Sequence, residues 1–424
     1  MAENRDNINL EEQLREDRRL AATHRRRKRM KWLIPLSCFL MATVAVLVVM
    51  IRSFRENRAE PTETEPPAEA SAVLAFVGDI SMDEAAVNAF RTPDGYDFSA
   101  CFRRVMPQLL AADLTLGNLE GNISDTPSDH TYPPALLDTL YASGFDVLQT
   151  ANSYSIQNGI TGLIQTKQAI ESAGMDALGT YGNEEEWEES GGVLVREVNG
   201  IRFAFIGFTK GVNSLRLPDG AGSCVNLLYT DYDTNFSVIA RSDILAVLER
   251  ARALEPDVIV ALLHWGSEYS EEITSSQKEI ASLLFSNGVS LIVGSHSHYV
   301  GPMESGRGSI FGSASTFIAY GLGDFLSAAD TTAARNGCIL SVRFDKKGDD
   351  IRLTTVNYTP TFSAAPDEDL GTTSYEVVDS LDAISFYESG YYDRVPSALY
   401  EKLKTYVERM KEQTGAGELQ IKKQ

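Results

Sequence analysis

The sequence is poor in cysteine, in histidine and in positive charge. Its 424 residues include four cysteines and five histidines, and its 38 lysines and arginines are outnumbered by 59 aspartates and glutamates, for a net charge of −21. The widely spaced cysteines exclude a fold held by several disulfides and show no zinc-ribbon pattern. The deficit of basic residues argues against a broad nucleic-acid-binding surface, because binding to a polyanion requires clustered lysine and arginine. An anionic ligand would need a local cation, such as a bound metal.

Long uncharged apolar stretches are also scarce, and one stands out between Leu33 and Ile51. As a helix rising about 1.5 Å per residue, this stretch would roughly span the hydrocarbon core of a membrane. We therefore predict one transmembrane helix over 33–51. A cleaved signal peptide is the alternative, but the run is long, 32 residues precede it, and the Ala68-Glu69-Ala70 match to a cleavage site lies far downstream.

Charge is distributed unevenly along the chain. Residues 1–60 hold 13 basic and 8 acidic side chains, which leaves 25 basic and 51 acidic side chains for the remainder. Basic residues cluster before the apolar run, so the positive-inside rule predicts that 1–32 is a cytoplasmic tail. The Pro- and Glu-rich segment 52–71 is typical of a solvated linker. We expect a single-pass protein of the cell membrane whose main domain is extracytoplasmic.

From residue 72 onward, short apolar runs alternate with amphipathic helical patterns, which is typical of an α/β fold. Three helix-to-strand joints with similar sequences, at Gly144, Gly174 and Gly288, suggest units of one sheet. Asn199-Gly200 predicts a β-hairpin, as does the pattern over 341–360, so either two packed sheets or one mixed sheet is expected. A terminal helix is predicted over 397–412. We assign 72–345 to the main domain and 346–424 to a C-terminal hairpin and helix packed on it.

Carboxylates and histidines follow several of the apolar strands. Asp79 and Glu120 each follow one strand, His264 follows another, and His296 and His298 follow a fourth. In an extended chain the last two imidazoles would point the same way. A Gly-Asp after a strand is as often a turn and helix cap. Carboxylates and imidazoles that converge at strand ends nevertheless match the oxygen and nitrogen ligands of a divalent-metal site, which we predict here.

Six short motifs occur in a characteristic order along the predicted main domain. They are GDISM (78–82), NLEG (118–121), AN with a glycine seven residues after the Asn (151–159), HWGSEY (264–269), GSHSH (294–298) and YGLGDFLS (320–327). Together they resemble the CapA family, which is associated with capsule and poly-γ-glutamate synthesis, over about residues 72–330. The resemblance implies a domain similar to the calcineurin-like metallophosphoesterases. Its fold would be two packed mixed β-sheets flanked by helices, an αββα sandwich with a metal site.

The resemblance also implies roles for individual residues. Its expected metal ligands are Asp79, Glu120, His264, His296 and His298. Glu268 and Asp324 would lie near the site, as catalytic groups that contact the ligands or the substrate. One or two divalent ions, of manganese, iron or zinc, would activate a water and bind a phosphoryl or similar tetrahedral centre.

One motif departs from the family pattern. The family usually has Ala-Asn-Asn-His, whereas this chain continues from Asn152 with Ser153 and Tyr154. Ser153 replaces an Asn that binds metal in the related phosphoesterases, and Asn152 is the candidate substitute ligand. Tyr154 takes the place of the catalytic histidine. A tyrosine hydroxyl, with an ordinary pKa of about 10, is a poor proton shuttle at neutral pH.

Two functions follow from these patterns. The first is a membrane-anchored, metal-dependent hydrolase or transferase in the biosynthesis or anchoring of capsule, poly-γ-glutamate or another envelope polymer. The second is a catalytically degenerate scaffold that binds metal or polymer for a membrane synthase complex. The expected partners are an anionic envelope polymer or its precursor, membrane-embedded capsule synthase components and the membrane, but no nucleic acid.

Overall fold

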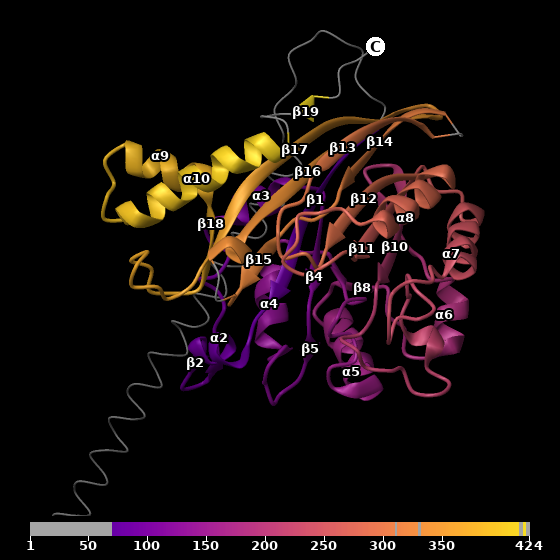
Figure 1. Ribbon diagram of the computed structural model, residues 1–424, viewed down its shortest axis with the longest axis horizontal. Helices are drawn as coiled ribbons and strands as arrows, with labels where there is room; N and C mark the ends of the chain where they lie inside the picture. Colours follow the sequence, from indigo (N-terminus) through magenta and orange to yellow (C-terminus); the bar gives the residue numbers. More distant parts are fainter. Residues whose placement is uncertain (1–69, 310–311, 330–331, 415–418, 421–424) are drawn as a thin grey trace, which may run out of the picture. The chain divides into compact units, whose positions relative to one another are not determined.

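Two β-sheets form the centre of the part of the chain that the computed structural model describes, residues 70–309, 312–329, 332–414 and 419–420 (Figure 1). The predicted tail and transmembrane helix, and most of the predicted linker, lie outside these residues. Within the described ranges, no helix combines the length and apolar character needed to cross a membrane.

The first sheet is mixed and has nine strands, in the order β18-β17-β16-β1-β4-β7-β8, with β15 beside β1 and β19 beside β17. Its strands are β1 (Ala70–Ser81), β4 (Leu114–Leu119), β7 (Val147–Gln149), β8 (Asp176–Leu178), β15 (Asp324–Ser327), β16 (Asn336–Lys347), β17 (Asp350–Ala364), β18 (Glu376–Asp379) and β19 (Leu419–Gln420). Strands β1, β4, β7 and β8 run parallel, whereas β16, β17 and β18 are antiparallel to their neighbours.

The second sheet has six strands, in the order β13-β14-β12-β11-β10-β9. Its strands are β9 (Leu194–Val198), β10 (Ile201–Thr209), β11 (Val258–His264), β12 (Val289–Ser295), β13 (Met303–Ser309) and β14 (Gly312–Ala319). Strands β10, β11, β12 and β14 are parallel, and β9 and β13 close the edges as antiparallel strands. Two further pairs of two-residue strands lie apart from these sheets: β2 (Arg91–Thr92) with β3 (Gly95–Tyr96), and β5 (Asn122–Ile123) with β6 (Thr131–Tyr132).

Most of the helices cover the outer faces of the two sheets, whereas the last one contributes Tyr406 and Met410 to the core between the sheets. The helices are α2 (Glu84–Ala89), α3 (Met106–Ala111), α4 (Ala135–Ala142), α5 (Gly159–Ser172), α6 (Glu184–Ser190), α7 (Arg241–Ala253), α8 (Ser275–Ser286), α9 (Ser380–Glu388) and α10 (Ser397–Thr414), with 3₁₀ turns η1 (Gly222–Cys224) and η2 (Thr332–Arg335). Leu136 and Leu140 of α4 pack on the first sheet, and Val247 of α7 and Ile280 of α8 pack on the second. Figure 1 shows α9 and α10 beside β17 and β18.

The main core lies between the two sheets. Phe76 of β1 and Phe344 of β16 belong to the same buried cluster as Phe203 and Phe205 of β10. Because side chains alternate along a strand, the neighbouring residues of β1 face the opposite side, where Val77 joins the cluster under the helices. The alternation therefore produces four layers, helices, sheet, sheet and helices, and confirms the predicted mixed α/β fold for the described residues.

Several local predictions are confirmed and one is wrong. Asn199 and Gly200 have φ values of 51° and 81° and join β9 to β10 as the predicted hairpin. The second predicted hairpin is β16–β17, and the terminal helix is α10. The three similar helix-to-strand joints do not belong to one sheet, because the strand that follows Gly288 pairs in the second sheet. The local sequence of a helix-to-strand joint does not specify which strand will be its neighbour in a sheet.

The segment after residue 345 is built into the first sheet. The predicted boundary at that residue lies inside β16, which pairs with β17 over its whole length. Helix α10 returns to the core, where the Tyr406 hydroxyl donates to Gly337 O at 2.6 Å. Cys101, Cys224 and Cys338 are buried and form no disulfide with one another.

Candidate metal centre

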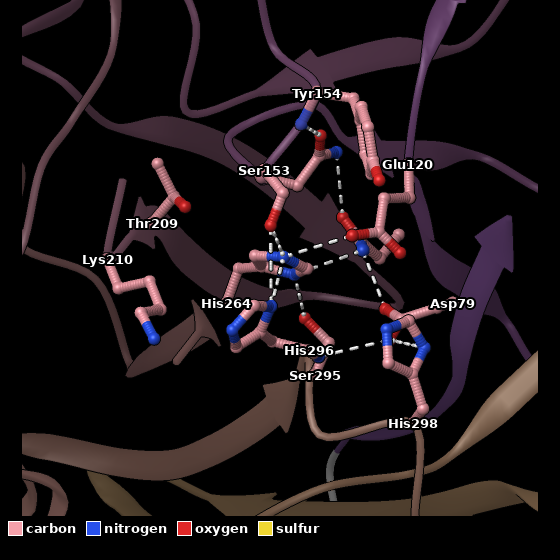
Figure 2. Close-up of polar contacts among 12 residues, drawn as sticks. Asp79, Glu120, Ser153, Tyr154, Thr209, Lys210, His264, Ser295, His296 and His298 are labelled. Atoms are coloured by element: carbon pink, nitrogen blue, oxygen red, sulfur yellow. Dashed lines mark hydrogen bonds and ion pairs between the residues drawn. The ribbon is translucent and has the colours of Figure 1, made fainter. Parts of the chain in front are cut away.

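Strands of both sheets end at one place and carry polar side chains there (Figure 2). Asp79 of β1 pairs with Asn118 of β4, and His264 of β11 pairs with Ser295 of β12. All four residues are buried, with exposed fractions of 6% or less. The carboxyl ends of parallel strands commonly form binding sites, because the following loops diverge there. The two sheets therefore contribute to one buried polar cluster.

The end of β1 is built by close backbone contact. Strand β1 pairs with β16 as far as Phe76 and with β15 from Asp79 onward, with a shift in register between Asp79 and Ile80. Asp79 N donates to Gly323 O at 3.1 Å. A Cβ at Gly78 would lie 1.7 Å from that same oxygen. Glycine at position 78 therefore lets β15 approach and sets the position of Asp79.

A first group of donor atoms surrounds Nε2 of His264. Glu120 Oε1 lies 3.2 Å away, His296 Nδ1 3.1 Å and Ser153 Oγ 3.0 Å away. Ligands of a tetrahedral zinc, at 2.0–2.1 Å from the ion, are roughly 3.3 Å from one another. The spacing of these four atoms thus suits a small divalent ion. Ser153, at the altered motif, is one of the four.

A second group shares Glu120 with the first. Asp79, Glu120 and His298 offer ligand atoms that all lie within 4.8 Å of one another. His298 Nδ1 lies 2.8 Å from Asp324 Oδ1 and 4.0 Å from Asp79 Oδ2. The arrangement brings together all five residues that the sequence predicts as ligands and, with Glu120 in both groups, suits one ion or a pair.

The chemistry of the cluster fits a divalent cation. Glu120 Oε2 is buried and has no hydrogen-bond partner among the described residues. Burial, together with the negative charge of Glu120, raises the pKa of Asp79 to about 7. Burial also lowers the pKa of His264 to about 4, which keeps the imidazole neutral, as metal binding requires. A cation would compensate the buried carboxylates and occupy the unpaired oxygen.

His298 behaves differently from the other two histidines. Burial lowers its pKa, but Asp324, through its charge and its hydrogen bond, and the charges of Glu120 and Asp79 outweigh this effect and raise the pKa to about 11. In the metal-free protein His298 is therefore charged, and its Nδ1–H donates to Asp324. Burial instead lowers the pKa of His296 well below its ordinary value.

Polar residues that the sequence analysis did not single out hold the ligands in place. Asn118 Nδ2 donates to Asp79 Oδ1 at 2.6 Å, and Ser295 Oγ lies 2.9 Å from His264 Nδ1. A proton on Nδ1, donated to Ser295, leaves the Nε2 lone pair of His264 free for metal. Asn118 and Ser295 lie inside the NLEG and GSHSH motifs, which was the available signal.

Asn152, the predicted substitute ligand, is not aimed at the donor groups. Its Nδ2 donates to Leu119 O at 2.7 Å and to Asn118 Oδ1 at 3.1 Å, and its Oδ1 accepts from Tyr154 N. The amide of Asn152 therefore joins the loop after β7 to the end of β4. The neighbouring Ser153 supplies the oxygen that faces the histidines.

The three predicted catalytic residues take different positions around the cluster. Asp324 is buried against His298. Tyr154 is half-buried and stacks on His130, a loop histidine without a predicted role, with ring centroids 3.6 Å apart. Burial, followed by the charge of Glu120, raises the pKa of Tyr154. Glu268 is exposed, and its charge is a further, smaller cause of the raised pKa of Tyr154.

The two histidines after β12 do not continue an extended strand. His296 and His298 have φ values of 87° and 57°, in the left-handed region that non-glycine residues rarely adopt. The reasoning that they point the same way from an extended chain is therefore wrong, although both reach the cluster. The turn directs them into different donor groups, and such strain is typical of functional sites.

The family assignment agrees with this geometry. The family model described as "Bacterial capsule synthesis protein PGA_cap" matches residues 73–329, which include every member of both donor groups. This chain belongs to the PGA_cap family. The PGA biosynthesis protein CapA of Bacillus subtilis (strain 168) is 24% identical over 316 residues, covering 73% of this chain and 77% of that protein. The capsule biosynthesis protein CapA of Bacillus anthracis is 25% identical over 290 residues, covering 65% of this chain and 64% of that protein.

Solved structures overlap with this PGA_cap member more loosely. The calcineurin-like phosphoesterase YfkN from Bacillus subtilis aligns with 79% of this chain and 99% of its own at 12% identity, with a TM-score of 0.40. A putative 5'-nucleotidase from Staphylococcus aureus aligns with 70% of this chain and 56% of its own at 13% identity, with a TM-score of 0.42. TM-scores below 0.5 leave the fold assignment to the topology of the chain itself.

Proposed function

We propose that the protein takes part in capsule, poly-γ-glutamate or related envelope-polymer production as a divalent-metal-dependent hydrolase or transferase. The observation that carries this proposal is the pair of donor groups that share Glu120, whose Oε2 has no hydrogen-bond partner among the described residues. Manganese, iron and zinc all suit ligand sets of imidazole and carboxylate. When bound, such ions lower the pKa of a bound water and stabilise a tetrahedral phosphoryl or similar centre.

The protein's own residues provide the remaining functions of the proposed site. Ser295 and Asn118 orient His264 and Asp79, and Asp324 holds His298. We assign Tyr154 and Glu268 to the substrate side of the proposed site, because one is half-buried and the other exposed. A hydroxyl with a raised pKa supplies a hydrogen bond to a leaving group rather than a ready proton. We therefore expect turnover to be slow.

The absence of a good proton donor at Tyr154 supports a second candidate. A scaffold that binds metal and polymer for a membrane synthase complex would need the same donor groups without rapid turnover. Losing a general acid costs roughly 10²- to 10⁴-fold in rate. Tyr154→His discriminates between the candidates. An enzyme limited by its proton donor gains activity on glycerol 2-phosphate, whose alkoxide leaving group must be protonated as it departs, whereas a scaffold gains none.

The proposed location rests on the sequence alone. We place the domain outside the cell membrane on the predicted helix over 33–51, with an anionic envelope polymer or its precursor and membrane-embedded synthase components as partners. The strongly acidic composition supports a protein partner or a locally bound anion rather than nucleic acid. Surface labelling of intact cells, compared with lysed cells, tests this orientation.

Metal content of the purified full-length protein tests the site itself. Glu120→Gln keeps the shape of the side chain and removes its charge, and Glu376→Gln makes the same change at an ion pair with Arg104, outside the cluster. We expect about one to two equivalents of manganese, iron or zinc in the wild type and in Glu376→Gln, and much less in Glu120→Gln. Wild-type protein without metal, even after incubation with these ions, contradicts the proposal.

A further inference from the structure

Lys210 follows β10 and lies next to the strand that carries His264. Thr209 pairs with His264 across the parallel strands, and Lys210 N donates to His264 O at 2.8 Å. The Lys210 side chain is half-buried, and Figure 2 shows it on the side of His264 and His296, away from Asp79 and His298. Burial is the main cause of the low pKa of His264 and His296, and the charge of Lys210 lowers both further. Its ammonium is thus part of the electrostatics of the cluster.

The described residues do not use every N–H donor of the Lys210 ammonium. Lys210 Nζ donates to Gly266 O at 2.8 Å and lies 4.5 Å from the ring centroid of Phe236. An ammonium has three N–H donors, so donor capacity remains. Within the described ranges Lys210 forms no ion pair. Burial lowers its pKa, and the charge of the exposed Glu268 opposes this effect only in part. A half-buried cation without an ionic partner is stabilised when an anion binds beside it.

We propose that Lys210 binds an anionic oxygen group, phosphate or carboxylate, of the ligand that occupies the candidate metal centre. The inference rests on the proposed function, because it assigns a ligand class to the same site. It explains how a chain with a net charge of −21 can hold an anion, since a cation in contact outweighs a repulsion that salt screens within about 8 Å. A purely structural lysine would support Gly266 and Phe236 without affecting anion affinity.

Two sources of such a group are compatible with the proposed function. A phosphorylated precursor would present phosphate oxygens, and a γ-linked glutamate chain would present carboxylates. Both groups accept charge-assisted hydrogen bonds from an ammonium. Inorganic phosphate and γ-L-glutamyl-L-glutamate serve as the two probes, and calorimetric titration of the manganese-loaded full-length protein measures the affinity for each.

The comparison uses two changes at Lys210 and one matched control. Lys210→Met removes the charge and keeps an apolar stem, and Lys210→Arg restores the charge. Lys404→Met removes the same charge from α10, where Lys404 Nζ lies 5.0 Å from the ring centroid of Tyr400. We expect Lys210→Met to weaken at least one probe roughly tenfold to hundredfold. We expect Lys210→Arg to recover part of that loss, and Lys404→Met to bind like the wild type.

Metal analysis of the same samples separates this inference from the proposed function. If Lys210→Met retains its metal and binds both probes as the wild type does, the role of Lys210 is overturned, as it is if the metal-loaded wild type binds neither probe. Wild-type protein that takes up no metal contradicts the proposed function, and titrating that protein with the probes still tests Lys210. If Lys210→Met does not fold, as judged by circular dichroism, Lys210→Gln replaces it. A loss confined to one probe identifies which source supplies the anion.

Discussion

Ser153 Oγ lies 3.0 Å from His264 Nε2 and completes the first donor group. It also lies 3.4 Å from His296 Nδ1. The preceding Asn152 faces the end of β4 instead, where its amide donates to Leu119 O. The departure from the family motif at position 153 therefore replaces one oxygen donor by another and leaves the donor group whole. The change that affects proton transfer is the one at Tyr154.

Replacing this hydroxyl tests its contribution to metal binding. We expect Ser153→Ala to weaken metal affinity roughly tenfold to hundredfold, because it removes one of four clustered donors or the hydrogen bonds that orient two histidines. Competition with a fluorescent chelator measures the affinity. Ser267→Ala, at an exposed position in the HWGSEY motif, is the control. Equal affinity in Ser153→Ala and the wild type would exclude Ser153 from the site.

Metal affinity should rise with pH across the acidic range. Burial and the charge of Glu120 raise the pKa of Asp79 to about 7, so a proton must leave before this carboxylate can bind metal. Between about pH 5.5 and 8 we expect affinity to increase more than tenfold. Asp79→Asn should flatten part of this dependence while binding more weakly overall. An affinity independent of pH in the wild type would contradict the assignment of Asp79.

His298 should make the metal-free protein less stable as the pH rises into the alkaline range. Its pKa is about 11 in the folded protein, above the ordinary value of 6.5, so the folded state holds the proton more strongly. The resulting stabilisation is complete below about pH 6.5 and is lost as the pH rises toward 11. We expect the melting temperature to fall between about pH 7 and 10. His298→Gln should show a flatter profile, and His130→Gln should keep the slope. If His298→Gln showed the same slope as the wild type, the role of the ion pair between His298 and Asp324 would be refuted.

Gly78 tests the backbone contact that positions Asp79. A methyl carbon there would lie 1.7 Å from Gly323 O. The backbone of residue 78 fixes the position of this carbon and Gly323 O belongs to the main chain, so neither can move aside easily. We expect Gly78→Ala to destabilise the protein by about 3 kcal/mol in chemical denaturation. Gly222→Ala, where no atom lies within 4 Å of the new carbon, should change stability little. Similar unfolding curves for the two variants would mean that β15 does not depend on this contact.

The sequence predicted the elements of this fold better than their arrangement. Buried runs such as 258–263 and the Asn199-Gly200 turn are local signals, and both appear in the structure as β11 and a hairpin. Sheet membership depends on contacts distant in sequence, which is why the strand after Gly288 was assigned to the wrong group. The residues of a single helix-to-strand joint do not predict which distant strand the following strand pairs with.

The same limit applies to the candidate site. Residue types at strand ends identified Asp79, Glu120 and the three histidines, because few buried strands end in such side chains. The roles of Asn118 and Ser295 depend on which atoms they meet across two sheets. Whether Asn152 or Ser153 faces the histidines depends on the turn after β7, and adjacent polar residues alone do not reveal its direction. His130 reaches Tyr154 from a separate loop, which no local pattern indicates.

Anomalous diffraction from crystals of the manganese-loaded protein shows directly whether, and where, the two donor groups bind metal. We expect an anomalous peak among Glu120 Oε1, His264 Nε2 and His296 Nδ1, and a second peak, if two ions bind, beside Asp79 and His298. Glu120→Gln should weaken or abolish both peaks because Glu120 belongs to both groups. A wild-type map with no peak within bonding distance of these side chains, at saturating manganese, would contradict the proposed metal centre.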